Sequence, residues 1–139
     1  MTSRILVIDD DPDFCKSTQA LLEAQGYLVA VASNVGEGLQ QVKDQPPDLV
    51  VLDIIMDNDW SGYEVNQAIR YGGDYQPAHE IPIIMVSTVQ VDPSLRFAMA
   101  GEVGMVTPDA YVTKPVDIPH FLELVRQLVA RRSAAASAR

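Results

Sequence analysis

The sequence predicts an α/β domain in which helices cover both faces of a mainly parallel sheet. Short apolar runs alternate with longer amphipathic stretches, and the pattern gives five strand–helix units. The runs Leu49–Leu52 and Ile81–Val86 are almost entirely apolar, which is typical of strands buried on both faces. Strands that alternate with helices pair in parallel, because each connection crosses over one face of the sheet.

The first strand is expected over Arg4–Ile8, a short run rich in β-branched residues. Asp11 and Pro12 then have the order of an N-cap acid followed by proline at the first helical position. Phe14 begins the apolar face of this helix, and Gly26 is placed to end it.

The second and third units have the same order of elements. A strand is expected over Tyr27–Ala32 and a helix over Asn34–Lys43, which its two internal glycines weaken. The buried run Leu49–Leu52 stops at Asp53, and a third helix is expected over Ser61–Tyr71.

The last two units complete the expected fold. The strand Ile81–Val86 is followed by a helix expected over Pro93–Glu102. A short strand over Ala110–Thr113 then leads to a final helix expected over Ile118–Arg132.

Length and composition restrict the class of protein. The chain has 139 residues, 47% of them hydrophobic, which suits one domain with a buried core. We expect this domain to span residues 1–132, and residues 133–139, mostly alanine and serine, to form a flexible tail. A net charge of −9 argues against direct binding of nucleic acid, because its phosphates need basic partners. Cys15 is the single cysteine, so an internal disulfide is excluded.

The location follows from what the sequence lacks. No apolar run is long enough to span a membrane, and the first residues do not have the layout of a signal peptide. We therefore expect a cytoplasmic protein without a membrane partner.

Polar residues follow the predicted strands at the points where the strands end: Asp9, Asp10, Asp53, Ser87 and Lys114. The carboxyl ends of parallel strands line one edge of the sheet, where ligands of such folds bind. Carboxylates brought together repel one another and need a cation, and a site of hard oxygen ligands suits Mg²⁺. A lysine and a hydroxyl beside them suit a phosphoryl group, and one carboxylate would be its nucleophile.

Four stretches of the chain resemble the receiver domains of two-component response regulators. They are Ile5–Pro12, Val50–Asp53, Ile83–Ser87 and Tyr111–Pro115, and the likeness runs from about residue 4 to residue 130. The resemblance implies a flavodoxin-like, doubly wound fold with five helices and a five-stranded parallel sheet in the order 2-1-3-4-5.

The same resemblance implies which residues form the phosphoryl site. Asp53 would be the phosphoacceptor. Mg²⁺ would be held by Asp9, Asp10 and Asp53 together with the backbone carbonyl of Ile55. Lys114 would contact the phosphoryl group.

A switch and a set of partners are also implied. Ser87 would be the switch hydroxyl, and Tyr111 the switch aromatic that swings inward on phosphorylation. The phosphoryl donor would be a sensor histidine kinase or a histidine phosphotransfer protein, so the chain would be a phosphoacceptor signalling domain rather than an enzyme. Its output would pass to an unidentified downstream protein or to a phosphorylation-dependent homodimer.

Several positions depart from the usual pattern of the family. The loop Met56–Gly62 is one residue longer, with Asp57 where family members often have proline. Thr88 follows the switch hydroxyl, where the family usually has a very small residue. Neither Ile55 nor Val89 has a side chain that orients a hydrolytic water, so we expect slow self-dephosphorylation.

Two other interpretations stay open at this point. A haloacid-dehalogenase-type phosphatase also has an Asp-x-Asp after an apolar strand, as Asp9 and Asp11 provide, but it leaves Asp53 without a role. A receiver-like adaptor would bind partners without using phosphate. The full acidic set and Lys114 argue against the adaptor, whereas Thr88 leaves room for it.

Overall fold

The computed structural model describes residues 3–54, 65, 68–69, 80–87, 110–114 and 116–137, with side chains as far as residue 132. Its strands form one parallel five-stranded sheet in the order β2-β1-β3-β4-β5, which confirms the predicted fold class and strand order. The strands are listed here with their bounds: β1 Arg4–Ile8, β2 Leu28–Ala32, β3 Leu49–Asp53, β4 Ile83–Ser87 and β5 Ala110–Thr113.

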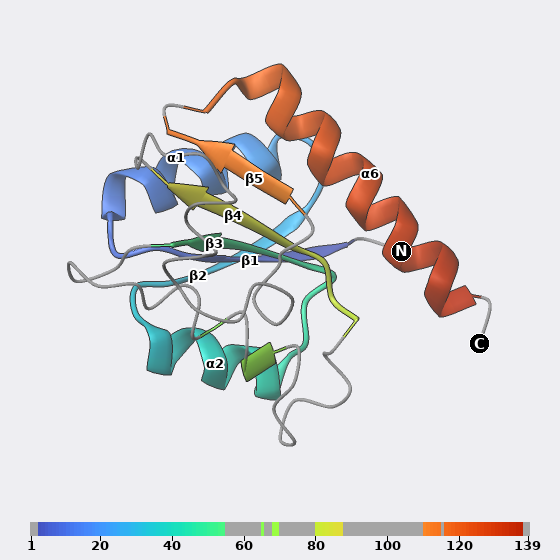
Figure 1. Cartoon of the computed structure of the whole chain (residues 1–139), viewed down its shortest axis with the longest axis horizontal. Coiled ribbons are helices and arrows are strands. Elements are labelled where there is room, and N and C mark those ends of the chain that lie inside the picture. The colour runs from blue at the N-terminus through green and yellow to red at the C-terminus, as the bar shows by residue number, and fades with distance from the viewer. Residues whose placement is uncertain are drawn as a thin grey trace, which may run out of the picture.

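Helices lie on both faces of the sheet (Figure 1). The helix α1, Pro12–Glu23, and the helix α6, Ile118–Ser137, cover one face, and α2, Val35–Asp44, lies against the other. The third predicted helix is seen at Val65, Ala68 and Ile69, which are helical. The helix predicted over Pro93–Glu102 lies outside the described residues.

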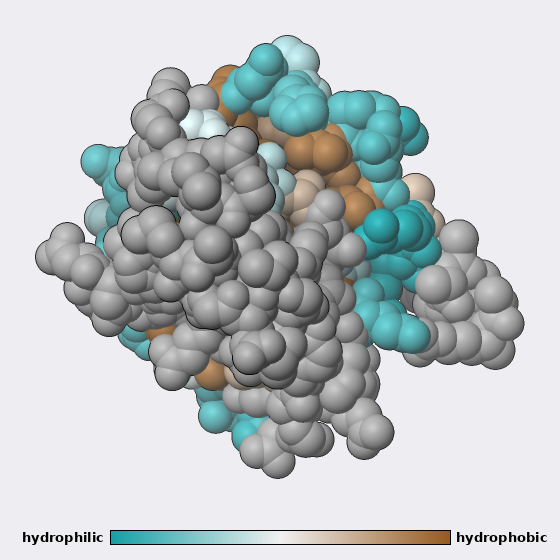
Figure 2. Space-filling view, viewed as in Figure 1, coloured by the Kyte–Doolittle hydropathy of each residue, from teal (hydrophilic) through white to brown (hydrophobic). Residues whose placement is uncertain are grey.

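Side chains alternate between two core layers because successive residues of a strand point to opposite faces. Along β3, Val50 and Leu52 pack in the layer beneath α2, whereas Leu49 and Val51 pack in the layer beneath α1 and α6. The second layer reaches the molecular surface next to α6, where Figure 2 shows apolar residues between hydrophilic ones.

The N-cap of the first helix forms as the sequence predicts, whereas the helix ends earlier than Gly26, with Ala24 as its C-cap. Asp11 is the N-cap of α1, and its Oδ1 accepts hydrogen bonds from the backbone N–H groups of Asp13 and Phe14 at 3.0 and 3.3 Å. After the helix, Gly26 adopts a φ of 95°, a left-handed conformation that glycine takes without strain.

The predicted end of the last helix at Arg132 is wrong, because α6 continues to Ser137. Neither glycine nor proline occurs after Arg132, and alanine, which has the highest helix propensity, makes up much of the extension. The division into a domain of residues 1–132 and a flexible tail of residues 133–139 stays a prediction. Within the described part of the chain, no helix is long and apolar enough to cross a bilayer.

Candidate functional site

Strand register brings the predicted site residues to one edge of the sheet. Ile8 pairs with Leu52, so the residues that follow, Asp9 and Asp53, lie at the same level of two neighbouring strands. On the next strands, Ser87 pairs with Thr113. The backbone N–H of Lys114 donates to the carbonyl of Ser87 at 2.8 Å, which ties the end of β5 to the end of β4.

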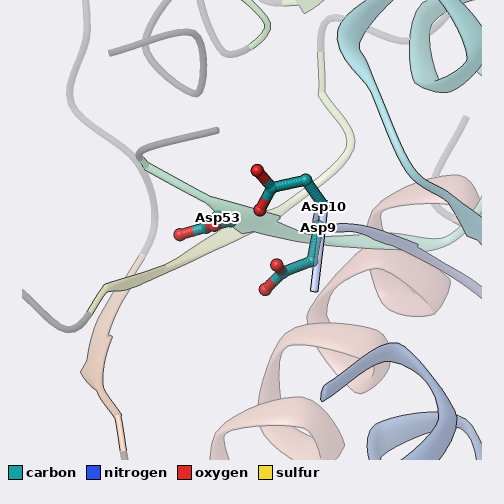
Figure 3. Close-up of side chains that lie close together, drawn as sticks. All are labelled: Asp9, Asp10 and Asp53. Atoms are coloured by element: carbon teal, nitrogen blue, oxygen red, sulfur yellow. The ribbon is translucent and has the colours of Figure 1, made fainter. Parts of the chain in front are cut away.

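Three carboxylates meet at this edge. Asp9, Asp10 and Asp53 each have a carboxylate oxygen within 4.8 Å of the others, and Figure 3 shows the three side chains gathered at the ends of β1 and β3. Asp9 is 1% exposed and Asp53 is 6% exposed, whereas Asp10 is exposed to solvent. Three hard oxygen donors at this spacing, one open to water, fit a divalent cation such as Mg²⁺.

Hydrogen bonds fix both oxygens of the buried Asp9 carboxylate. The backbone N–H of Asp11 donates to Oδ1 at 2.9 Å, and the ammonium of Lys114 donates to Oδ2 at 2.8 Å. A buried carboxylate is costly unless it is paired and hydrogen-bonded, and Asp9 satisfies both conditions. Asp9 is therefore held rigidly, and Asp10 is left as the solvent-facing acid.

Lys114 brings a positive charge to the three carboxylates. Its Nζ lies 2.8 Å from Asp9 Oδ2 and 4.0 Å from Asp53 Oδ2, and its side chain is only 14% exposed. The same Nζ lies 4.2 Å from the centroid of the Phe14 ring. The ammonium therefore stands between two carboxylates and over an aromatic face, beside the predicted phosphoacceptor.

A buried thiol lies directly behind the acids. The Sγ of Cys15 donates to the backbone carbonyl of Asp9 at 3.2 Å. Burial, followed by the negative charges of Asp9 and Asp11, raises the pKa of the Cys15 thiol to about 11. A neutral thiol at this position packs as a small apolar group rather than acting as a nucleophile.

The two predicted switch residues occupy different surroundings. Ser87 is 1% exposed at the end of β4. Tyr111 is half-buried on the α2 face of the sheet, where it packs against the core layer and its hydroxyl oxygen is buried. Ile55, whose carbonyl was predicted to bind metal, and Thr88 lie outside the described residues.

Phe14 is the site residue that the sequence did not indicate. Its place on the apolar face of α1 predicts a core residue, and nothing in the local pattern distinguishes it from Leu21 or Leu22. The contact with Lys114 joins positions 100 residues apart and depends on the packing of α1 beside the end of β5.

Comparison with known proteins identifies the family of the chain. The response regulator receiver domain model matches residues 5–126. The chain is 35% identical over 132 residues to the transcriptional regulatory protein KdpE of Mycobacterium tuberculosis, a match that covers 95% of this chain and 53% of KdpE. It is 28% identical over 129 residues to the polar-differentiation response regulator DivK of Brucella ovis, covering 91% of this chain and 95% of DivK. The chain thus spans about half the length of KdpE.

Solved structures share the fold over nearly the whole chain. A CheY-like response regulator receiver domain protein of Methanospirillum hungatei superposes with a TM-score of 0.79 at 27% identity, covering 97% of this chain and 99% of that one. A two-component response regulator of Clostridium difficile gives a TM-score of 0.77 at 25% identity, covering 94% and 98%. Since the family model covers most of its length, the chain belongs to the response regulator receiver domains of two-component systems.

Proposed function

We propose that the chain is a phosphorylation-operated receiver, in which Asp53 accepts a phosphoryl group in a Mg²⁺-dependent reaction. The observation that carries the proposal is the position of Lys114, whose ammonium lies 4.0 Å from Asp53 and 2.8 Å from Asp9 beside a cluster of three carboxylates. The donor is a phosphohistidine of a sensor histidine kinase or a histidine phosphotransfer protein.

The residues divide the chemistry between them. A carboxylate oxygen of Asp53 attacks the phosphorus, the bond from phosphorus to the histidine nitrogen breaks, and that nitrogen keeps the electron pair and takes up a proton from water. Asp9, Asp10 and Asp53 would hold Mg²⁺, which when bound offsets the charge of a phosphoryl oxygen. The ammonium of Lys114 donates to another phosphoryl oxygen, a short movement from its contact with Asp9.

Replacing the acceptor tests the proposal. The wild-type chain is expected to take one phosphoryl group from acetyl phosphate in Mg²⁺, and Asp53→Asn is expected to take none, as measured by intact-protein mass spectrometry. Asp11→Asn is a matched control, because it removes a charge two residues from Asp9 but keeps a side chain that caps α1. The control is expected to be labelled like the wild type. Labelling of Asp53→Asn to the wild-type level would overturn the assignment.

Two further measurements separate the alternatives from this function. Asp11, the second acid of the Asp-x-Asp, caps α1 and accepts from two amides of that helix, which speaks against a phosphatase site. Turnover of a generic phosphate ester would nevertheless favour that alternative. A wild-type chain that takes no phosphoryl group, and whose Trp60 fluorescence does not respond to Mg²⁺, would favour the adaptor.

The switch is a further part of the proposal. Phosphorylation draws the Ser87 hydroxyl towards the phosphoryl group, and Tyr111 then moves deeper into the core. Tyr111 starts from a half-buried position, so its movement needs to be only a small one. The slow self-dephosphorylation, the cytoplasmic location and the phosphorylation-dependent homodimer remain predictions.

A further inference from the structure

Besides its ion pairs, the Lys114 ammonium contacts an uncharged partner, the aromatic ring of Phe14. Its Nζ lies 4.2 Å from the centroid of the Phe14 ring, well within the roughly 6 Å over which an aromatic face attracts a cation. The lysine side chain is 14% exposed, so water screens this attraction less than it would at an open surface.

Hydrogen bonds fix the backbone from which the Phe14 ring projects. Phe14 lies in the first turn of α1, where its N–H donates to Oδ1 of the N-cap Asp11 at 3.3 Å. The N–H of Asp11 in turn donates to Asp9 Oδ1 at 2.9 Å. The ring that faces the lysine and the carboxylate that pairs with it are therefore anchored to the same short segment.

The charge of the pocket explains why an aromatic ring suits this position. Three carboxylates already meet at the site, and a phosphoryl group on Asp53 would add negative charge. Another carboxylate in place of Phe14 would hold the ammonium but repel the phosphoryl group. An aliphatic side chain would leave the ammonium without an attraction from that side. A ring face attracts the cation and adds no net charge.

We propose that Phe14 is a positioning residue for Lys114, which keeps the ammonium next to Asp53 when its contact with Asp9 gives way to a phosphoryl oxygen. The inference rests on the proposed function and adds to it a residue that acts on the reaction only through the lysine. The competing explanation is that Phe14 only fills space between α1 and the core, where it packs against the layer that includes Cys15.

Fluorination of the ring separates the two explanations, because it weakens the attraction of the ring face with little change in size. The whole chain of 139 residues, with mono-, di- or trifluorophenylalanine at position 14, would be labelled with acetyl phosphate in Mg²⁺. We expect the labelling rate constant to fall stepwise along the series, by about tenfold at its end, as expected for loss of a partly desolvated cation–π contact. Phe14→Leu should be slowed by a similar factor, and Phe14→Tyr should stay near the wild-type rate.

A second readout follows the contact itself. The ε-methylene protons of Lys114 should show an upfield ring-current shift in the wild type and in Phe14→Tyr, and the shift should be absent in Phe14→Leu. Leu21→Ala is the packing control: Leu21 also lies on α1 against the same core layer and lines the same cavity as Phe14 and Lys114. It is expected to lower stability without changing the labelling rate.

The outcomes distinguish failure of the inference from failure of the proposed function. If the wild type is labelled at Asp53 and the fluorinated variants are all labelled at the same rate as the wild type, the role of Phe14 alone is overturned. A slowed Leu21→Ala would also overturn it, because loosened packing would then account for the effect. Absence of labelling in the wild type would overturn the proposed function and, with it, the role given to Phe14.

Discussion

At the residue scale, the acids of the site differ in what surrounds them. Asp9 is buried with both carboxylate oxygens engaged, by the Asp11 amide and the Lys114 ammonium. Asp10 is exposed and directs its carboxylate towards the same cluster. Asp9 therefore holds the lysine. Under the proposed function, Asp10 would be the acid that exchanges water for a cation.

The Cys15 thiol makes stability depend on pH in the alkaline range. Its pKa is raised from the ordinary 9.0 to about 11, so the unfolded chain loses this proton at lower pH than the folded chain does. The folded state therefore loses stability as the pH rises between these two values, and the loss amounts to about 2 kcal/mol by the upper one.

Urea unfolding of the wild type and of Cys15→Ala, repeated across this pH range, measures the effect. The difference between their free energies of unfolding should be constant below pH 9.0. By pH 11 the wild type should have lost stability relative to Cys15→Ala. Other alkaline titrations occur in both proteins and cancel in the difference. A difference that does not change with pH would contradict the burial of the thiol.

At the element scale, α2 approaches β1 so closely that one of its glycines has no room for a side chain. A Cβ added at Gly38 would lie 2.6 Å from Cδ1 and 3.0 Å from Cγ1 of Ile8, a fully buried residue. At Gly36, in the same helix, the nearest atom would be Asn34 Oδ1 at 3.5 Å, an ordinary contact.

We therefore expect opposite effects from the same substitution at these two glycines. Gly36→Ala should stabilise the protein by up to about 1 kcal/mol, because alanine is the better helix former. Gly38→Ala should destabilise it by about 1–2 kcal/mol, because overpacking against Ile8 exceeds that gain. Thermal and urea unfolding of the two variants give the comparison.

A double variant identifies the cause of the loss at Gly38. Ile8→Val removes the Cδ1 atom that the new methyl group would meet. Ile8→Val alone should cost about 1 kcal/mol. Combined with Gly38→Ala, it should destabilise the protein by less than the sum of the two single losses, because the clash is relieved. Additive losses in the double variant would exclude the predicted clash.

The sequence predicts these elements well where local signals are strong. β1 and β5 have the predicted bounds, and α1 begins at the predicted cap. β4 begins at Ile83 rather than at Ile81, because Pro82 between them has no N–H to donate to the ladder, although its carbonyl accepts from Val50. The sequence predicts α6 too short because the residues after Arg132 have no apolar period to mark a packed helical face, although their alanines favour a helix.

At the scale of the whole molecule, the position of the candidate site could be predicted from the way parallel strands end at one edge of the sheet. Polar residues that end parallel strands meet at one edge, so Asp9, Asp53 and Lys114 were found without knowledge of their distances. The partner of Lys114 on the helix side could not be found in this way. Which residue of α1 lies under the ammonium depends on the packing of that helix against the end of β5, and no periodicity in the sequence records it.

Only the folded chain can offer the carboxylates to one cation, because Asp9 and Asp10 are distant in sequence from Asp53 and meet within 4.8 Å through the order of the sheet. Mg²⁺ should therefore bind the folded state alone and raise its free energy of unfolding, by about 2.7 kcal/mol at a concentration 100 times its dissociation constant. Urea unfolding in Mg²⁺ and in EDTA measures this gain, which Asp10→Asn should reduce strongly. Asp44→Asn makes the same change to the net charge of −9 at an exposed position on α2, and should keep the wild-type gain. An equal loss in both variants would mean that Mg²⁺ acts by screening the net charge rather than by binding at the three carboxylates.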